Sequence, residues 1–336
     1  MGNHTNIHWC DSTVNPTTGC DGCELWKLLG TKADLLRVMG GSCYAGNFHE
    51  QRLSKSLPAL YAADFTEVRM APGRMAKAAA WSDLTGKDRQ DKPWLNGLPR
   101  TIFVGDMGDI LSGAVSFEYL RSELIIPAQS WKGRRHIWMV LTKRPGRLAE
   151  FARWLWDNDW TEWPKNIWVG TSITGKASLG RIDDLVAVPA AYRFLSVEPL
   201  IEPVDLSPWL YGEAYGSTAG KRGGPGGQTV TAGPAPISLV IVGGESGPHA
   251  RPFNLQWARD IRDQCEAAGV AFFMKQLGAK PRENVKGPEF GLPSGLMSNK
   301  YQWAMKLKDS HGGDWDEWPA DLRVREFPRS EVGVVD

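Results

Sequence analysis

The sequence has little of what marks a membrane-bound or exported protein. It contains no run of about 18 consecutive apolar residues, the minimum that a membrane-spanning helix needs. Its first ten residues, MGNHTNIHWC, lack the basic stretch and the apolar run of a signal peptide, and they match a myristoylation signal poorly. These absences predict a cytoplasmic protein that does not contact a membrane.

Cysteine is also scarce, with five residues in a chain of 336. An odd, small number without an export signal makes a disulfide framework a poor explanation for them. Cys10 and Cys265 stand apart in the sequence and are expected to be buried structural thiols. Cys20, Cys23 and Cys43 lie close together, and they are therefore the first candidates for chemistry.

The chain has almost no excess charge, with 39 Lys and Arg against 38 Asp and Glu and a formal net charge of +1. This balance argues against a large basic surface for nucleic acid, but it does not exclude a local one. With 42% hydrophobic residues and 16 tryptophans, the chain can bury a sizeable core. The composition is that of a globular protein.

Six short apolar segments recur along the chain, each followed by Gly, Pro or polar residues and then a helix-compatible stretch. Their continuous hydrophobicity is typical of strands buried on both faces of a parallel sheet. This repetition predicts an α/β fold, a partial parallel (β/α) barrel of about six strands, with a doubly wound open sheet as the second architecture. The segments begin at Thr101, His136, Asn166, Tyr192, Ile237 and Val270, and a shorter seventh candidate spans 7–10.

Two breaks in this pattern set the expected domain limits. Residues 1–280 are expected to form the barrel, and residues 281–336 a C-terminal extension packed on it. The segment 211–236 is rich in Gly and Pro and has little apolar surface to bury. It is therefore expected to be a flexible insertion.

Polar or small residues follow each expected strand, at the point where the strand ends. In parallel barrels and open α/β sheets, ligands bind at the carboxyl ends of the strands. We therefore expect one shared cleft at this edge, although any one of these residues could simply mark the end of a strand. The candidates are Asp106, Asp109, Thr142, Lys143, Arg144, Ser172, Glu198, Gly243, Gly244, Glu245, Lys275 and Gln276.

The three clustered cysteines have the spacing C-x2-C-x19-C, and the next ligand-type residue is His49. Two thiolates separated by two residues can hold one metal because a tight turn, here with Gly22, directs both sulfurs to one side. From spacing alone two chemistries stay open. A structural zinc ion, the commoner case, would take Cys20, Cys23, Cys43 and His49. An iron–sulfur cluster would take the three thiolates and leave one iron free for a small molecule.

Seven separate motifs give the sequence a resemblance to a known family. In order they are TNIHWCDSTVNPTTGCDGC, CYAGNFHE, LTKRP, FLSVEPL, VGGESGPHARP, FFMKQLG and EWPADLRVREFPR, which extend from about residue 6 to residue 329. Together they resemble a family of phage-associated proteins with a three-cysteine motif, related to radical S-adenosylmethionine enzymes. The resemblance implies a radical-SAM-like partial barrel, a [4Fe-4S] cluster held by Cys20, Cys23 and Cys43, and S-adenosylmethionine bound at the open iron.

By the same resemblance, one electron from the cluster would cleave S-adenosylmethionine to methionine and a 5′-deoxyadenosyl radical, which takes a hydrogen atom from the substrate. The expected substrate is a nucleotide, a nucleic-acid base or a related metabolite, whose phosphate Lys143, Arg144 and Arg251 could bind. The expected partners are an electron-donor protein and a second modifying enzyme. The alternative is a zinc-stapled nucleic-acid-binding or adaptor protein without catalysis.

The sequence departs from the usual radical-enzyme pattern in two places. A long insertion displaces the third thiol, and the Gly-Gly-Glu triplet that usually follows the second strand occurs late, at 243–245. The second-strand position holds Gly-Asp-Met-Gly-Asp instead, so we expect Asp106 or Asp109 to bind the amino group of S-adenosylmethionine and Glu245 to face its ribose or the substrate. The residues of this loop assigned to the cofactor are Gly105, Asp106, Met107 and Asp109.

A helix is expected to start near Cys43. Its positive end would face the metal centre and favour reduction of that centre modestly. Tyr44 follows the third cysteine directly, and it could pack on the adenine, cover the cluster or belong to the core.

Overall fold

The structure is a computed structural model of the chain, and it describes residues 4–26, 43–211, 236–247, 249–286 and 297–328. It divides into two compact units, of which the first comprises Met1–Ser172, Gly180–Phe194 and Arg329–Asp336, and the second Ile173–Leu179 and Leu195–Pro328. The insertion expected at 211–236 lies almost wholly outside the described residues. No helix within the described ranges is long and apolar enough to cross a membrane.

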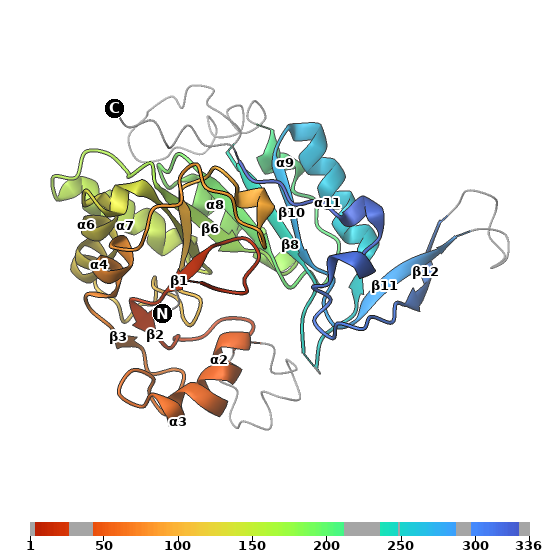
Figure 1. Cartoon of the computed structure of the whole chain (residues 1–336), viewed down its shortest axis with the longest axis horizontal. Helices are drawn as coiled ribbons and strands as arrows, with labels where there is room; N and C mark the ends of the chain where they lie inside the picture. The colour runs from red at the N-terminus through yellow and green to blue at the C-terminus, as the bar shows by residue number, and fades with distance from the viewer. Residues whose placement is uncertain (1–3, 27–42, 212–235, 248, 287–296, 329–336) are drawn as a thin grey trace. The chain divides into compact units, whose positions relative to one another are not determined.

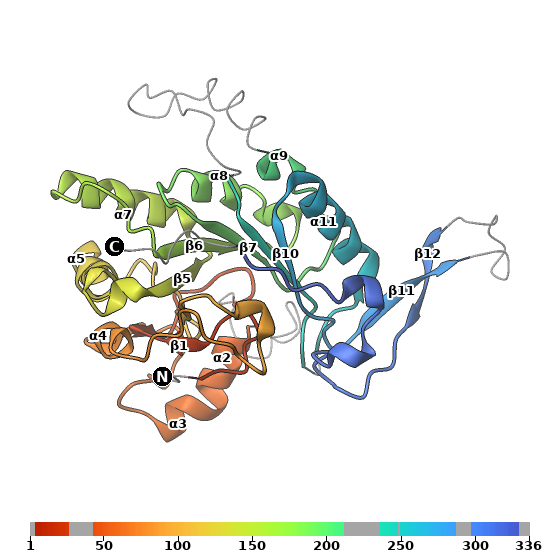
Figure 2. The same cartoon turned by 45° about the horizontal axis from the view of Figure 1, so that its top comes forward.

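Seven parallel strands form the main sheet, and their order in the sheet follows their order in the chain (Figures 1 and 2). A doubly wound sheet would reverse its strand order at one point, and this sheet does not. The α/β class is therefore confirmed, and the winding is that of a partial barrel. The strands are β1 (Ser12–Val14), β4 (Arg100–Val104), β5 (His136–Thr142), β6 (Ile167–Ser172), β7 (Arg193–Val197), β8 (Leu239–Gly243) and β10 (Ala271–Gln276).

The sheet has one strand more than the six expected. The additional strand is β1, which pairs in parallel with β4 so that Ser12 lies opposite Ile102. The candidate at 7–10 forms a turn and not a strand. All three residues of β1 are buried although two of them are polar, because pairing with β4 places them inside the sheet.

The first unit is built around strands that are buried along almost their whole length. Every residue of β4 and β6 is buried, and Trp138 and Trp168 are among the largest fully buried side chains. Burial on both faces explains why these segments are continuously apolar. The other elements are β2 (Thr17–Thr18), α2 (Tyr44–Phe48), η1 (His49–Leu53), α3 (Ser54–Ser56), β3 (Arg69–Met70), α4 (Arg74–Ala79), η2 (Pro93–Leu95), α5 (Phe117–Leu120), η3 (Arg121–Ile125), α6 (Ile126–Gln129), η4 (Gly133–Arg135), α7 (Pro145–Asp157) and α8 (Arg181–Val186).

The second unit contains the parallel pair β8 and β10, linked by helix α11 (Leu255–Ala268). The Asn254 side chain caps the helix by accepting a hydrogen bond from Gln256 N, and the helix ends at Gly269 in the left-handed region with φ of 67°. The remaining elements are η5 (Lys176–Ser178), α9 (Ser207–Leu210), β9 (Phe253–Asn254), β11 (Pro281–Lys286), β12 (Met297–Ala304), η7 (Trp315–Glu317) and η8 (Ala320–Leu322).

The last described residues of the chain run along the free edge of β10. Met274 N donates to Val324 O at 2.9 Å, and Glu326 N donates to Phe272 O at 2.9 Å. The Arg325 guanidinium lies over the rings of Phe273, Trp315 and Trp318 at 4.9–5.5 Å. The described part of 281–328 thus belongs to the second unit together with β10, and the limit at residue 280 stays a prediction.

Candidate functional site

The three clustered cysteines meet at one small apolar cluster of the first unit. Cys20 is buried with Trp26 and Phe65, and Cys23 and Cys43 pack against this group. Cys20 and Cys23 lie in the loop after β2, whereas Cys43 precedes α2 and caps it, since its Sγ accepts a hydrogen bond from Gly46 N at 3.4 Å. The expected helix start near Cys43 is confirmed.

Close backbone approach fixes the cysteine loop beside the loop that follows β4. Gly19 and Gly108 form a parallel β-bridge, and a Cβ on Gly108 would overlap the carbonyl oxygen of Gly19. On the other side of the loop, Cys20 N donates to Phe65 O at 2.8 Å. The position of the first thiol therefore depends on a glycine that sequence reasoning assigned no role.

Gly108→Ala should loosen the cysteine loop. The added methyl group has only backbone to displace, so we expect the free energy of unfolding to fall by about 1–3 kcal/mol and Cys20 to be alkylated faster. Mass spectrometry of iodoacetamide-treated protein measures the rate at each cysteine. Gly113→Ala is the matched control because its Cβ would meet only Asp21 Oδ2, at 3.5 Å. Equal alkylation of Cys20 in both variants would contradict this account of the loop.

Arg144, just beyond β5, ties the same loop to the sheet edge. Its Nη1 donates to Asp109 Oδ2 at 3.0 Å and lies 4.0 Å from Cys20 Sγ. Its Nη2 donates to Gly22 O at 2.7 Å and to the carboxylate of Asp21. The guanidinium is thus occupied by the protein, which argues against the phosphate-binding role expected of it.

Asp109 is fully engaged by its neighbours. Its carboxylate accepts hydrogen bonds from Thr142 Oγ1 at 2.8 Å, Lys143 N at 3.0 Å and Leu111 N at 3.0 Å, in addition to Arg144. A carboxylate so surrounded serves to position the ends of β4 and β5. Of the two aspartates expected to bind an amino group, Asp109 is the less suited.

Asp106 lies in a different environment in the same loop. Its Oδ1 accepts a hydrogen bond from Asn15 Nδ2 at 2.5 Å, and Met107 N donates to Asn15 Oδ1 at 3.0 Å. Burial raises the pKa of Asp106, so its charged form gains from a cationic ligand. Asn15, at the end of β1, is a site residue that sequence reasoning missed because β1 itself was missed.

The two other predicted residues of this edge differ in their surroundings. The carbonyl of Ser172, the last residue of β6, accepts a hydrogen bond from Arg181 Nη1 at 2.9 Å, while the same arginine pairs with Glu24 beside Cys23 at 2.6 Å. Burial raises the pKa of Cys43, and the charge of the half-buried Lys143 side chain opposes part of that rise. Lys143 forms no ion pair with the described residues, whereas Arg144 and Arg181 at the same edge do.

The thiols themselves favour the neutral form in the absence of a positive partner. Burial raises the pKa of Cys20, and burial raises the pKa of Cys43 to about 11. The neighbouring cysteines contribute to both shifts, so the three sulfurs lie within electrostatic range of one another. As the side chains stand, no three of His, Cys, Asp and Glu in the described part of the chain are close enough to hold a metal ion.

His49, the fourth ligand expected for zinc, is engaged away from the thiols. Its Nε2 lies 2.7 Å from Ala62 O, and its buried ring packs edge-on against Tyr61 and Phe65. Nδ1 has no hydrogen-bond partner among the described residues. His49 is therefore not a fourth donor beside the thiols, which are soft donors of the type that iron–sulfur centres and zinc prefer.

An exposed row of planar groups starts next to the third cysteine. The rings of Tyr44 and Phe48 are stacked at 5.8 Å with an angle of 10°, and the Arg52 guanidinium lies over Phe48 at 5.9 Å. Tyr44 is 68% exposed, so its ring is open to solvent and does not belong to the core.

The other predicted residues lie in the second unit, at the ends of β7, β8 and β10. Lys275 Nζ donates to both oxygens of Glu198 at 2.7 Å, and Glu245 accepts from Arg251 Nε at 2.8 Å. Gly244 is required by packing, since its Cβ would overlap Leu277 O, and a Cβ on Gly243 would meet Glu198 at 3.2 Å. Arg251 is thus paired with a carboxylate and is not available for the phosphate expected of it.

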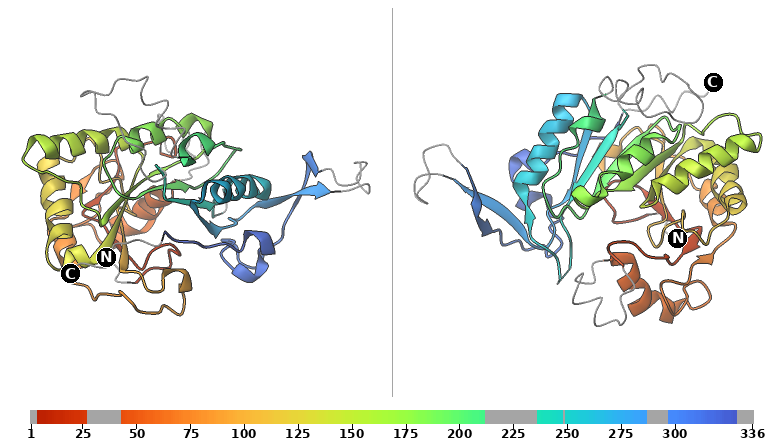
Figure 3. Two further views of the ribbon diagram at one scale, coloured as in Figure 1. Left: turned by 90° about the horizontal axis from the view of Figure 1, so that it is seen from above. Right: turned by 180° about the vertical axis from the view of Figure 1, so that it is seen from behind.

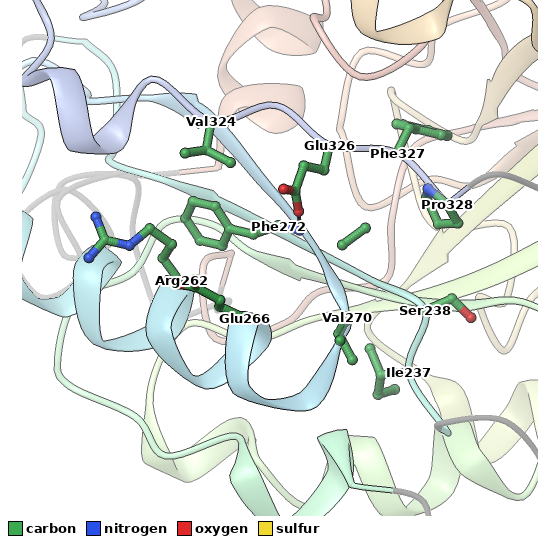
Figure 4. A pocket seen from close by; sticks show the side chains of 12 residues that line it. Ile237, Ser238, Arg262, Glu266, Val270, Phe272, Val324, Glu326, Phe327 and Pro328 are labelled. Carbon is green, nitrogen blue, oxygen red and sulfur yellow. Dashed lines mark hydrogen bonds between the residues drawn. The ribbon is translucent and has the colours of Figure 1, made fainter.

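The second unit also holds an open cavity of about 830 Å³ (Figure 4). Its lining includes Ile237 and Ser238 before β8, and Val270 and Ala271 at the start of β10. These residues mark the amino ends of the strands, the edge opposite to the one where parallel sheets bind ligands. None of the predicted site residues lines it.

Comparison with known proteins places the chain in one family. A family model described as "Protein of unknown function (DUF5131)" matches residues 4–319, so the chain belongs to this family. Searches of curated proteins and of solved structures find no significant match.

Proposed function

We propose that this member of the DUF5131 family is a radical S-adenosylmethionine enzyme that acts on a nucleotide, a nucleic-acid base or a related metabolite. One observation carries the proposal. Cys20, Cys23 and Cys43, separated by up to 23 positions in the sequence, pack on one cluster beside the loop that follows β4. Three soft thiol donors at the carboxyl edge of a parallel sheet suit a metal centre that also binds a small molecule.

The donor set favours an iron–sulfur centre over a structural zinc ion. A closed zinc site needs four protein ligands, and His49 is engaged with Ala62 instead of adding the fourth. The alternative, a zinc-stapled protein without catalysis, would also leave unexplained the buried Asp106 at the same edge. A [4Fe-4S] cluster held by the three thiolates, with S-adenosylmethionine bound beside it, would supply one-electron reductive cleavage of the sulfonium and hence radical hydrogen abstraction.

The residues of the chain would bind and orient these groups. The three thiolates would hold the cluster, and Asp106, held by Asn15, would bind the cationic amino group of S-adenosylmethionine. Lys143 would attract its carboxylate. Arg144 and Asp109 would act through the loop that they hold in place, without touching the cofactor.

The exposed aromatic row supports the proposed substrate class. Tyr44 and Phe48 present stacked rings next to the third cysteine, and aromatic stacking of this kind binds any nucleobase. Arg144 and Arg251 are paired with carboxylates, so the phosphate sites expected at these two residues are not part of the proposal. An electron-donor protein and a partner modifying enzyme remain predictions from the resemblance.

Anaerobic reconstitution tests the proposed function. Protein treated with iron and sulfide should turn brown, bind about four irons per chain and show an iron–sulfur EPR signal after reduction. Addition of S-adenosylmethionine and dithionite should then release 5′-deoxyadenosine. A colourless protein that binds one zinc per chain would refute the proposal and support the alternative.

A further inference from the structure

The antiparallel hairpin of β11 and β12 extends away from the rest of the second unit (Figure 3). The two strands are antiparallel, with Arg282 opposite Ala304 and Glu283 opposite Trp303. Met305 N donates to Pro281 O at 3.1 Å, which continues the same register beyond the strands. The next pair in this register is Lys280 and Lys306.

Three cations share one face of this hairpin. Because side chains alternate along a strand, Lys280, Arg282 and Lys306 point to the same side, with Ala304 between them. We call these three residues the basic hairpin face. Lys280, Ala304 and Lys306 are exposed, and Arg282 is half-buried. Like charges opposite each other across two strands are destabilising. An anion bound to this face would therefore stabilise the protein by reducing the repulsion between the cations.

The carboxylates near the basic hairpin face interact with residues outside that face. Glu283 lies on the other face, where it pairs with Arg259 of α11 at 2.7 Å. Glu317 accepts hydrogen bonds from the backbone of Lys308 and Asp309, so it offsets the charge of Lys308 and not that of the basic hairpin face. Among the residues with described side chains, none forms an ion pair with Lys280, Arg282 or Lys306.

The charge of the chain is concentrated in this hairpin. Residues 280–308 contain six Lys and Arg and two Asp and Glu, a net charge of +4, which leaves the remainder of the chain at −3 against a total of +1. A basic arm on an otherwise slightly acidic protein is the electrostatic footprint of a polyanion-binding surface.

The opposite face of the hairpin presents a large aromatic side chain. Trp303 is 52% exposed and lies on β12, an edge strand of its three-stranded sheet. Because Trp303 and the basic hairpin face lie on opposite sides of the ribbon, Trp303 does not contact a ligand that covers the basic hairpin face. A two-stranded ribbon also has the dimensions of the major groove of DNA.

We propose that the β11–β12 hairpin binds double-stranded DNA, with the basic hairpin face on the phosphate backbone. The proposal goes beyond the radical chemistry and does not require it. It also assigns a role to residues outside the metal-binding and cofactor-binding motifs. Nucleic acid is the occupant that this combination of phosphate-binding cations, a flat small-residue face and a ribbon of major-groove width fits.

Fluorescence polarisation with a short labelled DNA duplex tests the proposal. The chain is used without iron or S-adenosylmethionine, so failure of the proposed catalytic function leaves this result unaffected. The triple variant Lys280→Gln/Arg282→Gln/Lys306→Gln should reduce the slope of log K against log salt by about 2.7, because each lost phosphate contact removes about 0.9. Binding at about 0.1 M salt should weaken by roughly 100-fold or more.

A second triple variant controls for net charge. Lys77→Gln/Lys87→Gln/Lys165→Gln removes the same charge from exposed lysines of the first unit and should leave the slope unchanged. Trp303→Ala changes the opposite face of the ribbon and should leave both the affinity and the slope unchanged. The single variant Lys306→Gln, at an exposed position, should lower the slope by about 0.9. It tests the proposal even where the triple variant fails to fold.

Several outcomes would overturn the proposal. They are absence of duplex binding by the unaltered chain at low salt, equal weakening by the two triple variants, and tighter binding to single-stranded DNA than to the duplex. Binding to anionic lipid vesicles without binding to DNA would identify a membrane surface as the occupant instead.

Discussion

Replacement of Cys20, Cys23 or Cys43 by alanine should reduce the iron bound after anaerobic reconstitution from about four per chain to less than one. Each variant removes one of three thiolates, and two thiolates do not hold the cluster against the reducing and chelating conditions of purification. Release of 5′-deoxyadenosine should fall below detection in all three variants. Iron and sulfide analysis, with the visible absorption spectrum, measures the first effect directly.

Cys265→Ala is the matched control for these substitutions. Cys265 is buried on α11 in the second unit and is not a member of the cysteine cluster of the first unit. This variant should keep the full iron content and differ only in stability. Retention of iron by any of the three clustered-cysteine variants would show that the cluster, if present, is held by other residues.

The sheet could be predicted because its strands are apolar throughout. Burial on both faces demands a continuous apolar run, and β4, β5, β6 and β8 carry that signature in the sequence. β1 was missed because Ser-Thr-Val carries no such signal. Its place in the sheet is determined by pairing with β4, almost 90 residues further along the chain, and no local pattern reports that contact.

The candidate site could be predicted in its residue types but not in their roles. The sequence predicted that the cysteines and the polar strand ends share one site, and in the structure the three cysteines pack on one cluster, with the Gly19–Gly108 bridge joining their loop to the loop after β4. The sequence could not separate Asp106 from Asp109, since the difference lies in partners that are distant in the chain. Asp109 is satisfied by Thr142 and Arg144, whereas Asp106 has Asn15 at the end of the unrecognised strand.

Arg144 shows the same limit most clearly. In the sequence it belongs to a basic patch, Lys-Arg-Pro, which suggested a phosphate site. In the structure its guanidinium donates hydrogen bonds to Asp109, Asp21 and the carbonyl of Gly22. Arg144 thereby joins the end of β5 to the cysteine loop. The role of an arginine follows from the acceptors around it, which tertiary structure alone brings together.

Arg144→Ala should be among the most damaging single substitutions in the first unit. It leaves the buried carboxylate of Asp109 without its cation and releases the acceptors in the cysteine loop. We expect the free energy of unfolding to fall by about 3 kcal/mol, since removing one partner of a buried pair costs about 3–5 kcal/mol and this pair is partly exposed. Thermal unfolding should occur roughly 6–12 °C lower.

Release of the cysteine loop provides a second measurement, which a loss of stability alone would not affect. Alkylation of Cys20 should become faster, and reconstituted iron should be lost more readily. Arg259→Ala is the control, because Arg259 pairs with Glu283 and Asp321 at 2.7 Å each in the second unit. It should lower stability similarly without exposing Cys20.

Arg144→Lys keeps the charge but cannot reach all of the acceptors, so it should restore stability in part and leave Cys20 reactive. Protection of Cys20 in Arg144→Ala equal to that in Arg259→Ala would mean that the thiol is held by the Gly19–Gly108 contact without help from Arg144.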